Sequence, residues 1–210
     1  MKEKIRTAIT VMALLLGMSA AAQERKMNTL FSSGLRSSGG YGALTNSFTK
    51  IRGNFSNLSG FYGGWYINQR FLLGIGAAAS TNNIKVPLQF STNPARNRTY
   101  QYGQFGLKTE YVLGSDKALH IVLQAFGGAG FTLQYERNNW HTDPQYDDVT
   151  DENWFVVAEP GVQLELNLFK WMRFSPGVSY RAIFGSDGAG LKDKDLSAVS
   201  YSVTLKFGKF

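Results

Sequence analysis

The stretch VSYSVTLKF, residues Val199 to Phe207, alternates apolar and polar side chains without interruption. Successive side chains of a β-strand point to opposite faces, so this pattern predicts a strand with two unlike faces. The apolar face carries Val199, Tyr201, Val203, Leu205 and Phe207, and the polar face carries Ser200, Ser202, Thr204 and Lys206. This stretch is the clearest indication of an all-β protein.

The same two-residue period recurs along most of the chain. It is clear in residues 104–113, 119–136, 161–168 and 172–182, and weaker in Gly40 to Ile51, Phe55 to Asn68 and Phe71 to Ile84. With the C-terminal stretch, these segments make eight predicted strands. The composition agrees, because 14% aromatic residues and 23 glycines against 5 prolines favour strands and tight turns over helices.

The composition also narrows the possible chemistry of this 210-residue chain. Cysteine is absent, which excludes disulfides, thiolate metal sites and a thiol nucleophile. His120 and His141 are the two histidines, and the strand pattern puts them at opposite ends of the molecule. A shared metal site is therefore not expected, and we predict neither a cofactor nor a metal.

The first residues have the pattern of a secretory signal peptide. Lys2, Lys4 and Arg6 precede an apolar stretch that ends in Ala20, Ala21 and Ala22. A retained membrane anchor is the alternative, but it needs about 20 apolar residues, and this stretch is shorter. We therefore predict a signal peptide at residues 1–22, a flexible, serine-rich lead-in at residues 23–39, and one β-domain at residues 40–210.

Two kinds of all-β protein fit the alternation. A soluble barrel or sandwich buries its apolar face, whereas a membrane-spanning barrel turns that face to lipid and keeps the polar face inside. Several predicted strands reach a dozen residues, enough to cross a bilayer at a tilt. Connections also alternate in length: those near residues 68–70, 114–118 and 169–171 are tight, whereas 85–98, 138–153 and 185–196 are long and polar.

Large aromatic residues also cluster at two levels when the strands are placed with the tight connections at one end of the barrel and the long loops at the other. Trp65, Tyr66, Tyr111 and Trp171 lie near the tight turns, and Tyr135, Trp140 and Trp154 lie near the long loops. Two aromatic girdles are typical of outer-membrane barrels. The sequence therefore predicts an all-β, eight-stranded, antiparallel, up-and-down transmembrane β-barrel.

The chain from about Gly40 to Phe210 resembles the small eight-stranded outer-membrane β-barrels of Gram-negative bacteria, the class of OmpA membrane domains and OmpX. The stretch GGYGALTNSFTKIRGNFSNLSGFYGGWYIN, Gly39 to Asn68, also resembles uncharacterised outer-membrane barrel proteins. The final strand is similar to the signal recognised by the barrel-assembly machinery, with Tyr201, Val203, Leu205, Phe207 and Phe210. Phe210 departs from that signal because it is out of phase with Phe207. The resemblance implies an architecture and an address in the outer membrane, and no particular activity.

An interior enclosed by eight strands is just wide enough to be filled by side chains, so a general porin is not expected. The predicted inward-facing charges carry both signs and should pair and plug the lumen, because unpaired buried ions are costly. They are Lys108, Glu110, Glu136, Glu159, Glu165, Arg173, Arg181 and Lys206. We interpret the glutamates as part of this plug, since no histidine or activated hydroxyl is expected beside them for acid/base catalysis.

The leading hypothesis is a non-enzymatic outer-membrane barrel whose loops serve surface interaction or envelope integrity. Expected partners are outer-membrane lipid and lipopolysaccharide, the barrel-assembly machinery, and an extracellular ligand of loops 85–98, 138–153 and 185–196, with no nucleic acid. Lys85, Arg96 and Arg98 are candidates for lipopolysaccharide phosphates, with ordinary solvation of an external loop as the preferred alternative. An enzyme that modifies lipid A, with His141 on the outer side, is the first alternative. A narrow pore and a soluble lipocalin-like carrier are the others.

Overall fold

The computed structural model describes residues 39–67, 70–114, 117–136 and 149–208. The predicted signal peptide and nearly all of the predicted lead-in lie outside these residues. So do Trp140, His141, Phe210 and most of the loop 138–153.

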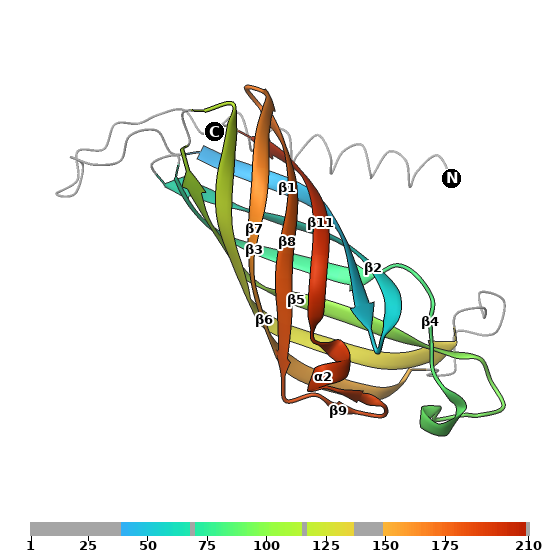
Figure 1. The fold of residues 1–210 in the computed structure, drawn as a ribbon. Helices are drawn as coiled ribbons and strands as arrows, with labels where there is room; N and C mark the ends of the chain where they lie inside the picture. Colours follow the sequence, from blue (N-terminus) through green and yellow to red (C-terminus); the bar gives the residue numbers. More distant parts are fainter. Residues whose placement is uncertain (1–38, 68–69, 115–116, 137–148, 209–210) are drawn as a thin grey trace, which may run out of the picture. The chain divides into compact units, whose positions relative to one another are not determined.

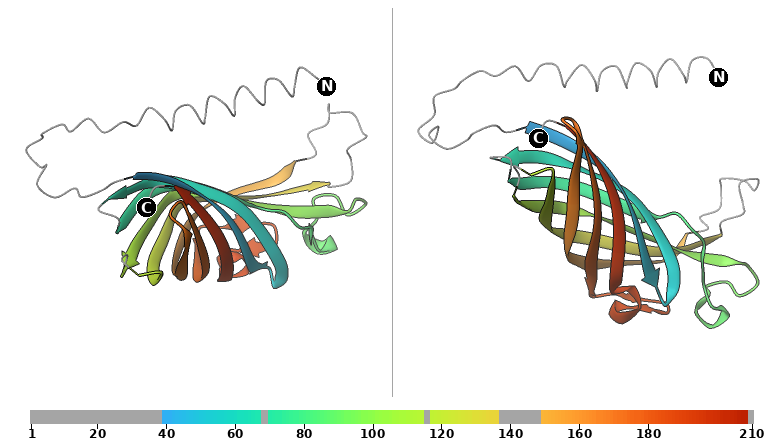
Figure 2. Two further views of the ribbon diagram at one scale, coloured as in Figure 1. Left: turned by 90° about the horizontal axis from the view of Figure 1, so that it is seen from above. Right: turned by 45° about the horizontal axis from the view of Figure 1, so that its top comes forward.

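Eight antiparallel strands form a closed ring, as the alternation predicted (Figure 1). They are β1 (Gly39–Ile51), β2 (Asn54–Ile67), β3 (Phe71–Ser80), β5 (Arg98–Leu113), β6 (Leu119–Glu136), β7 (Thr150–Phe169), β8 (Met172–Phe184) and β11 (Ala198–Gly208). Each strand pairs with the next along the chain, and β11 closes the ring by pairing with β1. Figure 2 shows the same ring from two further sides.

The two faces of the strands are arranged as in a membrane-spanning barrel. On β11, Tyr201, Val203 and Leu205 are exposed, while Thr204 and Lys206 are buried in the lumen. The other strands repeat this arrangement, with leucine, valine and aromatic side chains outside and glutamine, serine, threonine and charged side chains inside. No helix among the described residues has the length and apolar character to cross a membrane.

The connections distinguish two ends of the barrel. The short-turn end carries the links β2–β3, β5–β6 and β7–β8, and the loop end carries the other four. Three of those four are long, but β1 and β2 are joined by Arg52 and Gly53 alone. Both residues have positive φ, 50° and 74°, as a tight primed hairpin turn requires. The alternation of short and long connections therefore has one exception.

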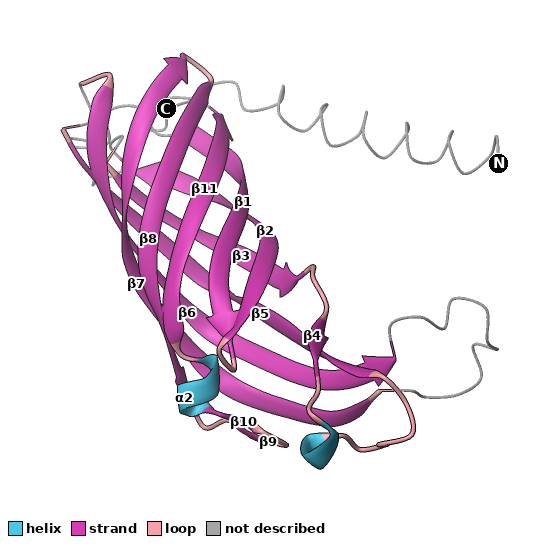
Figure 3. Ribbon diagram, turned by 45° about the vertical axis from the view of Figure 1, so that its right-hand side comes forward, coloured by secondary structure: helices cyan, strands magenta, loops and turns pink. Residues whose placement is uncertain are grey.

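Two long connections at the loop end are folded rather than extended into solvent. Residues 81–97 contain β4 (Ile84–Lys85) and the 3-10 helix η1 (Leu88–Phe90), and residues 185–197 contain β9 (Asp187–Gly188), β10 (Leu191–Lys192) and α2 (Asp193–Leu196). Figure 3 shows both helical turns at this end of the barrel. We refer to residues 81–97 and 185–197 together as the loop cap.

Candidate functional site

The lumen near the short-turn end is filled by a network of charged side chains. Lys206 Nζ lies 2.8 Å from Glu110 Oε2 and 2.5 Å from Glu165 Oε2. Strand β11 places the ammonium group between β5 and β7, which supply the two carboxylates. All three side chains are fully buried. One cation therefore bridges two carboxylates that would otherwise repel each other.

The remaining oxygen lone pairs of the two carboxylates are also bonded. Tyr41 and Tyr62 donate hydrogen bonds to the two oxygens of Glu110, at 2.6 and 2.8 Å. Arg173 Nη1 donates to Glu165 Oε1 at 2.6 Å. A buried ion pair is tolerated only when such additional bonds replace lost hydration. These bonds make the network a permanent part of the barrel interior.

His120 belongs to this network, contrary to the expectation that no histidine lies beside a glutamate. Its Nε2 lies 2.7 Å from Glu165 Oε1, and its Nδ1 lies 3.1 Å from the carbonyl oxygen of Lys117. The expectation failed because β6 and β7 pair in a register that places His120 directly opposite Glu165. We call Glu110, Glu165, Lys206, Arg173 and His120 the polar plug.

A hydroxyl group also lies beside Glu165, but the arrangement does not match a nucleophilic triad. Ser175 Oγ donates to Glu165 Oε2 at 3.1 Å, so its hydrogen bond goes to the acid and not to the imidazole. The imidazole in turn contacts a backbone carbonyl on its other side. Ser175, His120 and Glu165 are all buried. The geometry supports a structural role, because the hydroxyl does not contact the imidazole and is buried away from any substrate.

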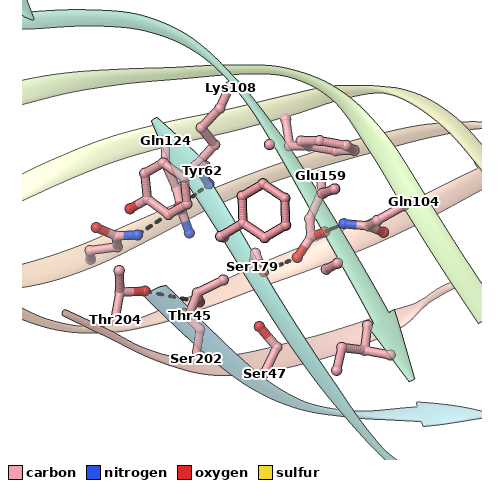
Figure 4. A pocket seen from close by; sticks show the side chains of 17 residues that line it. Thr45, Ser47, Tyr62, Gln104, Lys108, Gln124, Glu159, Ser179, Ser202 and Thr204 are labelled. Carbon is pink, nitrogen blue, oxygen red and sulfur yellow. Dashed lines mark hydrogen bonds between the residues drawn. The ribbon is translucent and has the colours of Figure 1, made fainter. Parts of the chain in front are cut away.

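A cavity with about 60 Å³ of space for water lies in the middle of the barrel (Figure 4). Lys108 and Glu159 both line it, yet they do not pair with each other. Lys108 Nζ donates to Gln124 Oε1, while Glu159 accepts hydrogen bonds from Gln104 at 3.2 Å and Ser179 at 2.6 Å. Among the described residues, neither charge has an ion-pair partner. The expectation that all lumen charges pair is therefore wrong for these two.

Water is the ligand that fits this cavity. Its volume accommodates about four to six water molecules, since one water needs about 10–15 Å³ by this measure. Gln163 Oε1 and Ser202 Oγ line the cavity and have no hydrogen-bond partner in the part of the chain that the structure describes. The polar groups on the cavity wall also lower the cost of burying Lys108 and Glu159 away from bulk water. The polar cavity thus explains why two unpaired charges are tolerated.

Above the cavity, the loop cap closes the barrel with apolar side chains. Its Ile84, Val86, Leu191 and Leu196 are buried against the inner wall, and Phe90 packs on the same cluster. The wall contributes Ile51, Leu58, Tyr100, Tyr102, Phe126, Phe155, Val157 and Ile183. This end of the lumen is therefore filled by a small hydrophobic core. At the short-turn end the polar plug lies among a second buried cluster, made of Tyr41, Ala43, Tyr62, Tyr66, Leu72, Val112 and Val122.

Polar contacts hold the loop cap to the wall. Arg52 in the β1–β2 turn donates to the carbonyl oxygen of Gly190 and lies over the ring of Phe90, 4.4 Å from its centroid. Asp151, on β7, accepts from the amide of Ala189 at 3.0 Å and from Gln134 Nε2 at 2.9 Å. Arg52 therefore contacts both segments of the cap.

The remaining predicted lumen charges lie near the loop end. Glu136 pairs with Arg96 at 3.2 Å on the partly exposed rim. Arg181 is fully buried, donates to the carbonyl oxygens of Leu196 and Lys50, and lies 4.7 Å from the ring centroid of Tyr102. Neither residue belongs to the polar plug, so the predicted single network is divided between the two ends.

The structure places most predicted girdle residues on the outer face. Trp65, Tyr111, Trp154 and Trp171 are exposed there, and Tyr135 is half-buried. The girdle prediction is wrong for Tyr66, which is 1% exposed and points into the lumen. The sequence alone indicates the inward position of Tyr66, because neighbouring residues of a strand face opposite sides and Trp65 and Tyr66 cannot both face lipid. The same parity places Tyr41 and Tyr62 inside, where they bind Glu110.

No protein-family model and no curated protein matches this chain. A crystal structure of Neisserial surface protein A is similar, with a TM-score of 0.56 and 10% sequence identity over 85% of this chain and 100% of that one. The chain has the fold of the small outer-membrane β-barrels. At this identity the likeness concerns the fold alone.

Two further structures overlap this outer-membrane-type barrel less closely. One is a major outer membrane protein from Thermus thermophilus, with a TM-score of 0.49, 7% identity, and coverage of 80% of this chain and 99% of that one. The other is Ail, the attachment invasion locus protein of Yersinia pestis, with a TM-score of 0.45, 10% identity, and coverage of 81% and 97%.

Proposed function

We propose that this protein is a non-enzymatic barrel of the Gram-negative outer membrane, closed to solutes, that presents its loop end at the cell surface for interaction or envelope integrity. The double closure of the lumen, by the polar plug at one end and the loop cap at the other, is the observation that carries the proposal. A barrel built for passage would leave a continuous polar path, whereas here a hydrophobic core and a bonded ion network lie in series.

The outer membrane is the environment that fits the exposed apolar belt. Exposed leucine, valine and aromatic side chains surround the barrel on every strand, which no soluble carrier would tolerate. The experiment is membrane fractionation followed by electrophoresis of heated and unheated protein. We expect recovery in the outer-membrane fraction and a mobility that changes on heating. Recovery in the periplasm without detergent would refute the proposal.

Closure to solutes is tested by single-channel recording in planar bilayers. We expect the purified protein to add no resolved conductance, because the polar plug and the loop cap block the same axis. Incorporation must be shown independently, by flotation of the same protein with vesicles. Discrete conductance steps in proportion to the incorporated protein would favour a narrow pore instead.

Orientation is tested by labelling single cysteines, since the natural chain has none. Leu88→Cys places a thiol on η1 in the loop cap, where the side chain is 71% exposed. Lys117→Cys places one in the β5–β6 turn. An impermeant maleimide should label the first variant in intact cells and the second only after the outer membrane is permeabilised. The reverse pattern would contradict surface presentation of the loop end.

Outer-leaflet lipid phosphates are the partner we propose for the exposed cations of the loop end. Lys85 and Lys50 are exposed there, Lys50 on the lipid-facing side of β1. Arg98, by contrast, is 8% exposed and binds the carbonyl oxygen of Gln134, so it is not available to a headgroup. Recognition by the barrel-assembly machinery through Tyr201, Val203, Leu205 and Phe207, which lie on the outer face, remains part of the proposal.

A further inference from the structure

A hydrogen-bonded polar pair lies on the outer face of β1 and β2. Asn46 on β1 and Ser59 on β2 are directly opposite each other, and Ser59 Oγ donates to Asn46 Oδ1 at 3.0 Å. Their outward neighbours on the short-turn side are Leu44 and Phe61, 61% and 64% exposed, and on the loop side Phe48 and Asn57. The Asn46–Ser59 pair therefore faces lipid, not the lumen.

The depth of this pair follows from the strand geometry. A strand tilted by about 40° advances about 2.5 Å per residue along the membrane normal. Trp65, at the short-turn interface, lies six residues from Ser59 on β2, which puts the pair about 15 Å above that interface. The exposed Lys50 pairs with Phe55, ten residues from Trp65 and about 25 Å above the interface, where the apolar band of such barrels ends. The Asn46–Ser59 pair thus lies inside the band, well below its upper edge.

A lipid environment cannot complete the hydrogen bonding of this pair. The serine occupies Asn46 Oδ1, whereas Asn46 Nδ2 carries two N–H donors and has no acceptor within the described chain. Hydrocarbon offers neither an acceptor nor water, so these donors carry a cost unless another protein surface covers them. An asparagine amide is complementary to a second asparagine amide, because each group supplies both a donor and an acceptor.

We propose that the β1–β2 face is a dimerisation surface on which Asn46 pairs with Asn46 of a second copy across a two-fold axis. A two-fold axis brings the same residue of both copies together, which the amide's self-complementarity satisfies without a different partner. Small residues also lie on this face: Ala79 is beside Ser59 in the sheet, and Gly42 and Gly63 lie one outward position closer to the short turns than Leu44 and Phe61. Small residues let two membrane-embedded surfaces approach closely enough for such bonds.

Cysteine cross-linking in lipid vesicles tests this arrangement directly, because the natural chain has no cysteine. Asn46→Cys and Ser59→Cys should each form a disulfide-linked dimer under mild oxidation. Val162→Cys and Leu123→Cys are the matched controls, since these two residues also pair directly across two strands and face lipid on the opposite side of the ring. The controls should remain monomeric. Equal cross-linking at all four positions indicates random collision and overturns the proposal.

The hydrogen bond itself is tested with a variant that needs no cross-linker. Asn46→Leu removes the amide while keeping a lipid-compatible side chain of similar size, and Val162→Leu is its control. Sedimentation of the full chain in a density-matched detergent should show dimers of the natural protein. The dissociation constant of Asn46→Leu should rise about threefold to twentyfold for each lost hydrogen bond.

The outcome for the dimer is separate from the outcome for membrane placement. All variants are first checked for the heat-modifiable mobility of a closed barrel, so a folding failure is recognised before association is measured. A closed barrel that stays monomeric in both detergent and vesicles overturns the dimer and leaves the proposed function intact. A dimer that persists unchanged in Asn46→Leu overturns the role of the amide.

Discussion

Lys206 shows how one side chain can determine the state of the short-turn end of the lumen. Its ammonium group contacts both Glu110 and Glu165. Arg173 and His120 contact Glu165. Loss of Lys206 therefore leaves Glu110 with two tyrosine donors but without its direct ion pair, inside a medium that screens poorly.

Replacing Lys206 should be far more costly than replacing the other inward-facing lysine. Lys206→Met leaves a buried carboxylate uncompensated, and we expect a loss of about 3–5 kcal/mol in the free energy of unfolding. Lys108→Met removes one hydrogen bond beside the polar cavity, for an expected loss of about 1–2 kcal/mol. Urea unfolding in lipid vesicles measures both. Equal losses would mean that the polar plug does not depend on the bridging cation.

At the scale of the strand pair, β5 and β6 approach each other through two opposing glycines. Gly106 and Gly128 are paired in the register, and both face the lumen. A Cβ added to Gly128 would lie 2.2 Å from the carbonyl oxygen of Phe105 and 2.6 Å from the Cα of Gly106. Backbone atoms cannot move aside as a flexible side chain can, so this part of the wall requires glycine.

The neighbouring glycine provides a control for this requirement. A Cβ at Gly127, which faces outward, would meet nothing within 4 Å. Gly128→Ala should therefore sharply reduce the fraction of protein that refolds into a heat-modifiable barrel, whereas Gly127→Ala should refold like the natural protein. The measurement is the ratio of folded to unfolded bands on unheated gels. Similar yields for the two variants would show that the wall can relax around a methyl group.

The β1–β2 turn acts as an element through Arg52, which contacts both segments of the loop cap. Arg52→Asn removes the hydrogen bond to Gly190 and the cation–π contact with Phe90, while asparagine tolerates the positive φ of this position. The open population of residues 185–197 should rise on the order of tenfold. Trypsin cleavage at Lys192 and Lys194 reports that population. Lys50→Asn, outside the cap, should leave the cleavage rate unchanged.

For the whole molecule, the two closures act in series along one axis. Weakening either one should leave the lumen blocked by the other, so Arg52→Asn and Arg173→Ser should each remain silent in planar bilayers. The combined variant should show small conductance steps, because the water-sized cavity between the closures then connects to both sides. Conductance in either single variant would show that one closure alone seals the barrel.

The facing of nearly every strand residue could be read from the chain, because alternation is a local property of an extended backbone. Residues 199–207 place Lys206 inside and Leu205 outside before any partner strand is known. Tyr66 and the Asn46–Ser59 pair obey the same parity. The girdle prediction failed at Tyr66 because it placed this residue by its proximity to Trp65 and not by its parity along the strand.

Tertiary structure alone decided which inward-facing groups meet. His120 and Glu165 come together through the register of β6 with β7, and Lys206 reaches two carboxylates because closure of the ring brings β11 opposite β5. Lys108 and Glu159 also face the lumen, but they do not pair with each other. The long loops likewise became a cap through contacts with Arg52 and Asp151. Periodicity along one strand carries no information on distances across a lumen, since those depend on register, on closure and on how the loops fold back.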